Sequence, residues 1–300
     1  MRRLSLILLL MIILISSCTL DGGLAWINSN FEDKQEIKTE SEDSTFLLVT
    51  DIHAGRDDDS KVYNMDIGLF KEWLSTNNIE FDFALNLGDT SDNGEKKEYS
   101  AYKEFCTEMD LLEEEIIFEV VGNHDIKGNN RWRKPWMTNT GKQPYYKIIS
   151  SGVEFYFLDN AQRSFGTTQL KKLEEAVSKS EKPKIFLAHY PLYGNLSVYT
   201  YFALASQEEK AFILNLMKKN NAKIYLCGHQ HNGAADYDFK NGTYQINIES
   251  FHGSTSIFES VPTFYIGEIE IDEETKKLSL SRYEYRKNSI IFVESKSYSL

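Results

Sequence analysis

Histidines and aspartates gather in a few short motifs of this 300-residue chain. Five of its six histidines lie in these motifs, and each motif follows an apolar run. The motifs read DIH, GDTSD, GNHD, AHYP and GHQH, and they contain Asp51, His53, Asp89, Asp92, Asn123, His124, Asp125, His189, His229 and His231. Imidazole and carboxylate groups bind divalent transition metals, and they also transfer protons in acid–base catalysis. The pattern therefore predicts a metal site with acid–base chemistry.

The segments between these motifs must fold so that the motifs meet. Short apolar runs typical of β-strands lead into the motifs, in residues 45–51, 81–89, 115–123, 184–191 and 223–231. Patterns with helical spacing separate them, in residues 61–77, 95–114, 168–180 and 206–221. Residues 145–160 indicate a β-hairpin, and the strand-rich tail after residue 242 is expected to complete a second sheet. Alternating strands and helices indicate a layered α/β core, in which ligands bind beyond the carboxyl ends of the strands.

Taken singly, each motif is compatible with an ordinary turn, but together and in order they form a set. The set resembles the motifs of the calcineurin-like metallophosphoesterase family over residues 51–231; it consists of Asp51-x-His53, Gly88-Asp89, Gly122-Asn123-His124-Asp125, His189 and Gly228-His229-x-His231. The resemblance implies an α/β/β/α sandwich of two mixed β-sheets flanked by helices. The metal site would lie at the carboxyl ends of the strands, in a domain spanning residues 45–300.

The resemblance also implies two divalent ions, of Mn, Fe or Zn, held by seven residues. One ion would take Asp51, His53 and His231, the other would take Asn123, His189 and His229, and Asp89 would bridge the two. A hydroxide bridging the ions would attack phosphorus. Because Asn123 is uncharged, the site would keep about one net positive charge, which suits a phosphate oxygen pair.

The proton for the departing alkoxide is expected from His124, which is adjacent to the ligand Asn123. An imidazolium needs a carboxylate that orients it. The resemblance assigns this part to Asp92, three residues after the bridging Asp89. Asp125, the immediate neighbour of His124, is the alternative.

The expected reaction is hydrolysis of small phosphodiesters, of nucleotide or lipid-headgroup type. This preference rests on the lack of arginine near the predicted ligands, because a monoester dianion needs more positive charge. Phosphomonoester hydrolysis by the same fold is the alternative. A different class also stays open, in which a surface lipoprotein keeps the fold for binding and has no catalytic activity.

Substrate contacts must come from loops. Residues 129–139 carry Arg131, Arg133 and Trp136, a basic and aromatic group that could hold a phosphate and stack a base. An ordinary surface loop over the core would look the same. Tyr190 begins a Tyr-rich segment that could line the cleft or form a hydrophobic lid, and His252 is expected in a loop.

The chain begins with a basic MRR and a short apolar run, which is typical of a secretory signal over residues 1–17. The sequence LISSC resembles a bacterial lipobox, so we expect lipidation of Cys18, an acidic tether over residues 18–44, and an exported, membrane-anchored lipoprotein facing the periplasm or the cell exterior. An ordinary cleaved signal is the alternative. Cys106 and Cys227 are expected to be separate buried thiols.

The formal net charge of −12 argues against a nucleic-acid polymer as partner, since binding to phosphates needs clustered Lys and Arg. A small phosphorylated ligand at a local positive centre is compatible with that charge. The sequence leaves the oligomeric state open.

Overall fold

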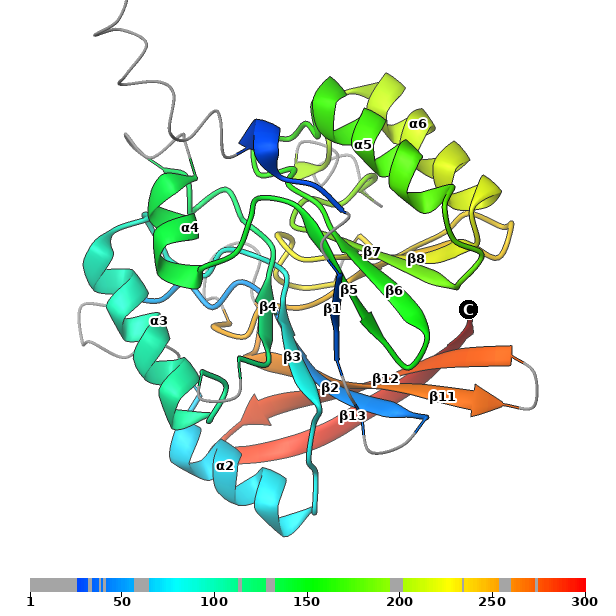
Figure 1. The fold of residues 1–300 in the computed structure, drawn as a ribbon. Helices are drawn as coiled ribbons and strands as arrows, with labels where there is room; N and C mark the ends of the chain where they lie inside the picture. Colours follow the sequence, from blue (N-terminus) through cyan, green and yellow to red (C-terminus); the bar gives the residue numbers. More distant parts are fainter. Residues whose placement is uncertain are drawn as a thin grey trace, which may run out of the picture.

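Two β-sheets stack face to face, and helices cover the outer face of each (Figure 1). The computed structural model describes residues 26–31, 34–37, 39, 42–56, 65–112, 115–127, 133–194, 202–233, 235–253, 260–272 and 275–300. This arrangement is the expected α/β/β/α sandwich of two mixed sheets.

The first sheet has seven strands in the order β1-β5-β6-β7-β8-β10-β9. The strands are β1 (Lys34–Glu36), β5 (Tyr146–Ser150), β6 (Val153–Phe157), β7 (Lys184–Ala188), β8 (Ala222–Cys227), β9 (Tyr237–Asp238) and β10 (Tyr244–Asn247). All neighbours are parallel except the predicted β5–β6 hairpin and the β9–β10 pair.

The second sheet has six strands in the order β13-β12-β11-β2-β3-β4. They are β2 (Ser44–Val49), β3 (Phe83–Asn86), β4 (Ile117–Glu119), β11 (Thr263–Asp272), β12 (Thr275–Arg286) and β13 (Ser289–Ser299). β2, β3 and β4 are parallel, whereas the three tail strands are antiparallel. The strand-rich tail thus contributes to both sheets, because β10 joins the first.

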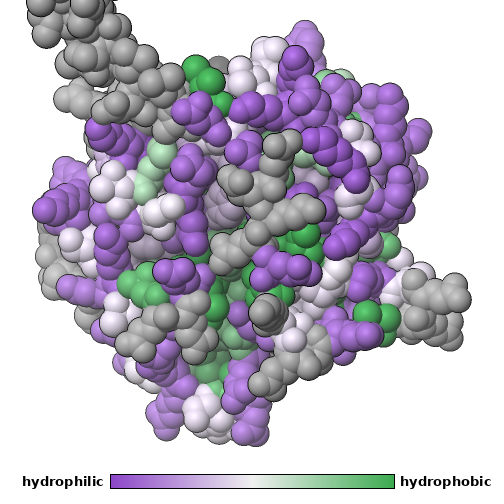
Figure 2. All heavy atoms as spheres, viewed as in Figure 1, coloured by the Kyte–Doolittle hydropathy of each residue, from purple (hydrophilic) through white to green (hydrophobic). Residues whose placement is uncertain are grey.

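Alternating apolar side chains of the two sheets form the central core, as Phe46 and Phe83 do against Phe155. Helices α5 (Thr167–Val177) and α6 (Gln207–Lys219) bury their apolar stripes on the outer face of the first sheet. Helices α2 (Ile67–Thr76) and α3 (Lys96–Glu108) cover the second sheet, and the short α4 (Lys134–Thr140) lies beside α3. Figure 2 shows mostly hydrophilic side chains over α3, α5 and α6.

Part of the expected tether is folded onto the domain, which corrects the domain start at residue 45. β1 pairs with β5, and Phe31 is buried to 2% exposure against Tyr145 and Tyr156. The indole Nε1 of Trp26 donates to Asp159 Oδ2 at 3.1 Å. The segment folds back because its few large apolar side chains find a place on the sheet, although its overall composition is polar. The predicted signal and Cys18 lie outside the described residues.

Cys106 and Cys227 are free and buried, as expected for separate thiols. Among the described residues, no helix combines the length and apolar character needed to span a bilayer.

Candidate metal centre and active site

The five motifs meet where the carboxyl ends of strands from both sheets come together. β2, β3 and β4 are adjacent parallel strands of one sheet, and β7 and β8 are adjacent parallel strands of the other. Their loops are tied to one another by backbone hydrogen bonds, such as Asp51 N to Gly88 O at 2.9 Å and Gly228 N to His189 O at 3.0 Å. The topology therefore gathers residues that are up to 180 positions apart.

Four of the gathered residues have left-handed backbone conformations. The φ angles are 51° at Asp51, 48° at His53, 53° at Asp89 and 69° at His229. Such a conformation costs a residue with a side chain about 1–2 kcal/mol. Strain of this kind is typical of functional sites, where the surrounding structure holds a side chain in a required direction.

Gly122 is required by the close approach of two motif loops. A Cβ atom at this position would lie 2.1 Å from the backbone nitrogen of Asp89 and 2.2 Å from its Oδ1. The same loop is held by Asp125, which is fully buried and accepts hydrogen bonds from Gly122 N and from the backbone and hydroxyl of Ser91.

One group of potential ligands consists of Asp51, His53 and His231, and Asp89 lies beside it. His53 Nε2 lies 3.3 Å from His231 Nε2 and 3.8 Å from both Asp51 Oδ1 and Asp89 Oδ2. His53 Nδ1 contacts Asp92 Oδ1 at 3.1 Å. A proton on Nδ1 would donate to that carboxylate, which leaves Nε2 free for a cation.

A second group consists of Asp89, His189 and His229, and Asn123 joins it. His189 Nε2 lies 3.2 Å from Asp89 Oδ2, 3.0 Å from Asn123 Oδ1 and 3.2 Å from His229 Nδ1. His189 Nδ1 contacts the Leu87 carbonyl at 2.9 Å, which again leaves Nε2 for the cluster. Asp89 is near both groups, as a bridging residue must be.

The protonation states suit a pair of cations. Burial lowers the pKa of His53 to about 4, and burial with the charge of His189 lowers the pKa of His229 to about 3, so both imidazoles are neutral. Burial also lowers the pKa of His189, but the Asp89 carboxylate outweighs it and the net pKa is about 9. A cation bound there would displace this proton.

The buried His229 Nε2 has no hydrogen-bond partner, and the buried Asp51 Oδ1 meets only imidazole nitrogens, with His231 Nε2 at 3.2 Å. A buried polar atom left unpaired costs about 1–3 kcal/mol. Carboxylate, amide and imidazole donors that converge in this way fit Mn, Fe or Zn, so the residues present suit the metals that the sequence predicts.

His124 stands at the edge of the cluster, with 20% of its side chain exposed. Its Nδ1 lies 2.7 Å from the Asp92 carbonyl and 3.4 Å from Asp92 Oδ1, and its Nε2 lies 4.0 Å from Asp89 Oδ2. Burial lowers the pKa of His124, but the charge of Asp89 and hydrogen bonds to Asp92 outweigh this and raise it. No contact joins His124 to the Asp125 carboxylate among the interactions of the described residues, so Asp92 is the group that orients it.

The sequence profile of calcineurin-like phosphoesterases matches residues 44–233. This chain belongs to the calcineurin-like phosphoesterase family. It is accordingly a phosphoric ester hydrolase.

A relative of this phosphoesterase in Fibrobacter succinogenes is named "Probable cyclic nucleotide phosphodiesterase". The two are 26% identical over 191 residues, which cover 61% of this chain and 71% of the relative. Among solved structures, the chain is similar to Vacuolar Protein Sorting 29 from Cryptosporidium parvum, at 14% identity and a TM-score of 0.47, covering 86% of this chain and 99% of that one. It is also similar to a calcineurin-like phosphoesterase from Bacillus subtilis, at 13% identity and a TM-score of 0.39, covering 86% and 90%.

Two predicted substrate contacts of this phosphoesterase are structural instead. Arg133 forms a two-point ion pair with Asp159, at 2.6 Å from Nε and 3.0 Å from the terminal nitrogen. Trp136 is fully buried in α4, next to Val121 and Tyr99. Arg131 lies outside the described residues. Tyr190 does reach the cluster, where its ring centroid lies 3.9 Å from that of His229.

Several residues near the candidate metal centre lie outside the sequence motifs and were not predicted to be there. Arg56 Nε lies 3.8 Å from Asp92 Oδ1, and Lys127 Nζ donates to the Asp92 carbonyl at 3.1 Å. An arginine therefore does lie near the site, which weakens the sequence argument for diesters. His252, expected in a loop, is buried with its ring 6.3 Å from that of His53. Of these residues, only Arg56 could have been noticed in the sequence, because it follows the motif residue His53 by three positions.

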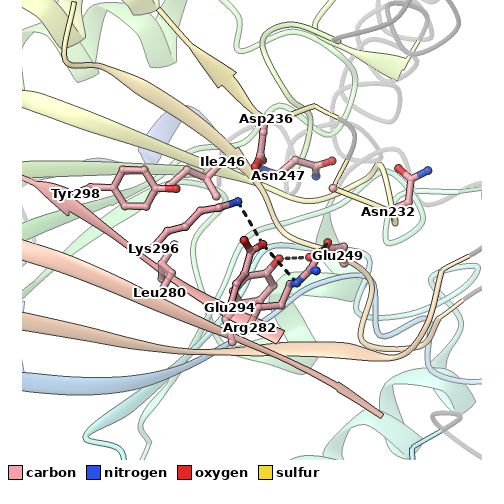
Figure 3. A pocket seen from close by; sticks show the side chains of 12 residues that line it. Asn232, Asp236, Ile246, Asn247, Glu249, Leu280, Arg282, Glu294, Lys296 and Tyr298 are labelled. Carbon is pink, nitrogen blue, oxygen red and sulfur yellow. Dashed lines mark hydrogen bonds and ion pairs between the residues drawn. The ribbon is translucent and has the colours of Figure 1, made fainter. Parts of the chain in front are cut away.

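A polar cavity of about 220 Å³ lies between the two sheets. Figure 3 shows Arg282 of β12 reaching toward Glu249, with Glu294 and Lys296 of β13 beside it. Glu249 also accepts from the Tyr265 hydroxyl. The next residue, Ser250, donates to the Asp51 carbonyl at 3.0 Å, so this cross-sheet cluster supports the loop under the metal centre.

Proposed function

We propose that this phosphoesterase hydrolyses small phosphodiesters with two divalent metal ions. The observation that carries the proposal is the convergence of six donor residues around Asp89. One ion would be held by Asp51, His53 and His231, the other by Asn123, His189 and His229, with Asp89 between them. When bound, the two ions would lower the pKa of a water between them and supply a hydroxide near neutral pH.

Side chains of the protein would carry out the proton transfer to the leaving group. His124 would give its proton to the ester oxygen that leaves, because its Nδ1 is held by Asp92 and its Nε2 is directed to the cluster. Asp92 would fix the rings of both His53 and His124. Diesters are favoured over monoesters because the Fibrobacter relative is named as a phosphodiesterase and because the cations Arg56 and Lys127 are already engaged with Asp92.

The test uses the full-length protein loaded with Mn, Fe or Zn, with bound metal measured by mass spectrometry. We expect kcat/KM for bis(p-nitrophenyl) phosphate to exceed that for p-nitrophenyl phosphate, and Asp89→Asn to abolish both activities. A higher value for the monoester would favour the phosphomonoesterase alternative. Full metal occupancy without turnover of either ester would favour a non-catalytic binding protein.

We also propose that the protein is exported and anchored through a lipid on Cys18, after removal of residues 1–17. The signal and lipobox patterns support this proposal. Mass spectrometry of the mature protein, compared with Cys18→Ser, would detect the diacylglyceryl group. An unmodified N-terminus at another residue would contradict it.

A further inference from the structure

The two sides of the metal centre differ in chemistry. His124 lies with His53 and Asp89 in a third group of potential ligands, which shares only Asp89 with the group that contains His229. Around His124 the neighbouring side chains are charged or polar: His53, Asp92, Arg56 and Lys127. Around His229 they include two aromatic rings, Tyr190 and Phe202.

The aromatic side is held firmly in place. The Asn160 side chain makes two hydrogen bonds to the backbone of Tyr190. It donates to the Tyr190 carbonyl at 2.9 Å and accepts from the Tyr190 nitrogen at 2.9 Å. The Tyr225 hydroxyl donates to the same carbonyl at 2.8 Å. These three hydrogen bonds are buried, so the Tyr190 ring is set against His229 before any ligand arrives.

Phe202 is the ring of this pair that faces solvent, because Tyr190 is only 7% exposed. Its ring centroid lies 6.0 Å from that of His229, and 37% of the residue is exposed. The adjacent Ala203 carbonyl accepts from Arg163 Nε at 3.0 Å, and Leu204 N donates to the Pro191 carbonyl at 2.8 Å. Phe202 is thus held on a supported turn near His229, and its exposed ring can cover a planar group.

We infer that these rings give the metal centre a direction. An aromatic ring on the ester group that stays on phosphorus packs against the exposed Phe202, next to His229 and the buried Tyr190 ring behind it, and the alcohol that leaves lies toward His124. The inference rests on the proposed phosphodiesterase function and specifies its substrate class as esters of nucleoside 5′-phosphates. Any nucleobase can stack on such an aromatic side chain, because every base has a planar π-face.

The reaction balances with one water. The water loses a proton to solvent and its oxygen forms a bond to phosphorus. The bond from phosphorus to the leaving oxygen breaks, and that oxygen takes the proton from His124, which regains one from solvent. In an in-line displacement the leaving oxygen departs opposite the attacking water, so the retained substituent lies to the side and can reach the aromatic surface. The products are a nucleoside 5′-monophosphate and an alcohol.

Adenosine 5′-methyl phosphate tests the direction, because its two ester oxygens are both primary alkoxides of similar leaving ability. The metal-loaded full-length enzyme should release methanol and adenosine 5′-monophosphate. Release of adenosine and methyl phosphate would overturn the inference while leaving the phosphodiesterase function intact.

Calorimetry tests the aromatic surface without turnover. Adenosine 5′-monophosphate should bind roughly 5- to 150-fold more tightly than ribose 5-phosphate, the range expected for stacking of one base. Phe202→Ala and Tyr190→Leu should each reduce this ratio, whereas the matched control Phe292→Ala, at a 56% exposed position of β13, should not. Equal binding of the two ligands by the wild-type protein would overturn the inference, even if no ester were hydrolysed.

Discussion

Asn123 and His124 are neighbours in the chain, but their side chains serve different atoms. Asn123 Oδ1 lies 3.0 Å from His189 Nε2, inside the cluster, whereas His124 is tied to Asp92 at its edge. The backbone nitrogen of His124 donates to Asp89 Oδ1 at 2.8 Å, which fixes both residues relative to the Asp89 carboxylate. Adjacent residues can therefore supply a ligand and an acid.

Alanine substitutions should separate these two roles. We expect Asn123→Ala to lower the metal content by reducing occupancy of one site. His124→Ala should keep the metals and slow esters with poor leaving groups by about 10²- to 10⁴-fold, with a much smaller effect on nitrophenyl esters. Metal analysis and kcat/KM for both ester types provide the readout. Loss of metal in His124→Ala would show that His124 is a ligand and not the acid.

Gly122→Ala should damage the centre through packing alone. The added methyl group would meet Asp89 backbone atoms that cannot move without shifting its carboxylate. We expect destabilisation of about 1–3 kcal/mol, typical of overpacking, together with loss of metal binding. The control is Gly68→Ala in the first turn of α2, where the nearest contact is 3.3 Å. Equal melting temperatures and metal content in the two variants would contradict the steric argument.

Among the elements, β4 ends in a carboxyl that the fold keeps neutral. Glu119 is fully buried, one of its oxygens has no partner, and burial raises its pKa to about 8 from 4.5. The native state therefore keeps this proton up to about pH 8, whereas the unfolded chain loses it near pH 4.5. The contribution of this proton to the free energy of unfolding is fully present below pH 4.5 and is lost as the pH rises to 8.

Glu119→Gln should remove this pH dependence. Relative to wild type, the variant should gain stability between pH 5 and 8, by at most about 1.4 kcal/mol per pH unit. Urea unfolding at several pH values would measure the difference, with the exposed Glu174→Gln as control. If the wild-type and Glu119→Gln curves stay parallel over this range, Glu119 is ionised in the folded protein.

The elements that carry the motifs were predictable, because β2, β3, β7 and β8 are apolar runs that stop at polar residues. The elements that were missed lack such a pattern. α4 has only seven residues, about two helical turns, which is too short for a repeating apolar pattern to stand out in the sequence. Pro135 near its start is nevertheless typical of a first helical turn. β1 is the polar tripeptide KQE and depends on β5 for its pairing.

Site residues that belong to sequence motifs were predicted from the sequence. The prediction failed for residues whose partners lie far away along the chain. Arg133 looked available for phosphate because its partner Asp159 lies 26 positions further along the chain. Trp136 looked exposed because its neighbours are polar, but its helix turns the ring into the core. Arg56 and Phe202 are single residues, and only the folded loops bring them to the cluster.

At the scale of the whole molecule, the N-terminal segment is part of the folded unit. Phe31→Ala should lower the free energy of unfolding by about 3 kcal/mol or more, as expected for loss of a buried Phe. Ile27→Ala, at a 53% exposed position of the same segment, should have little effect. Denaturant unfolding of the two variants measures this difference. Unchanged stability in both would mean that the segment is only a tether.

The central claim is that one cluster of seven residues holds two metal ions where the two sheets meet. Anomalous diffraction from crystals of the manganese-loaded protein tests it most directly. We predict two peaks about 3.5–4 Å apart, one among Asp51, His53 and His231 and the other among Asn123, His189 and His229, with Asp89 between them. A single peak, or peaks outside these residues, would contradict the account.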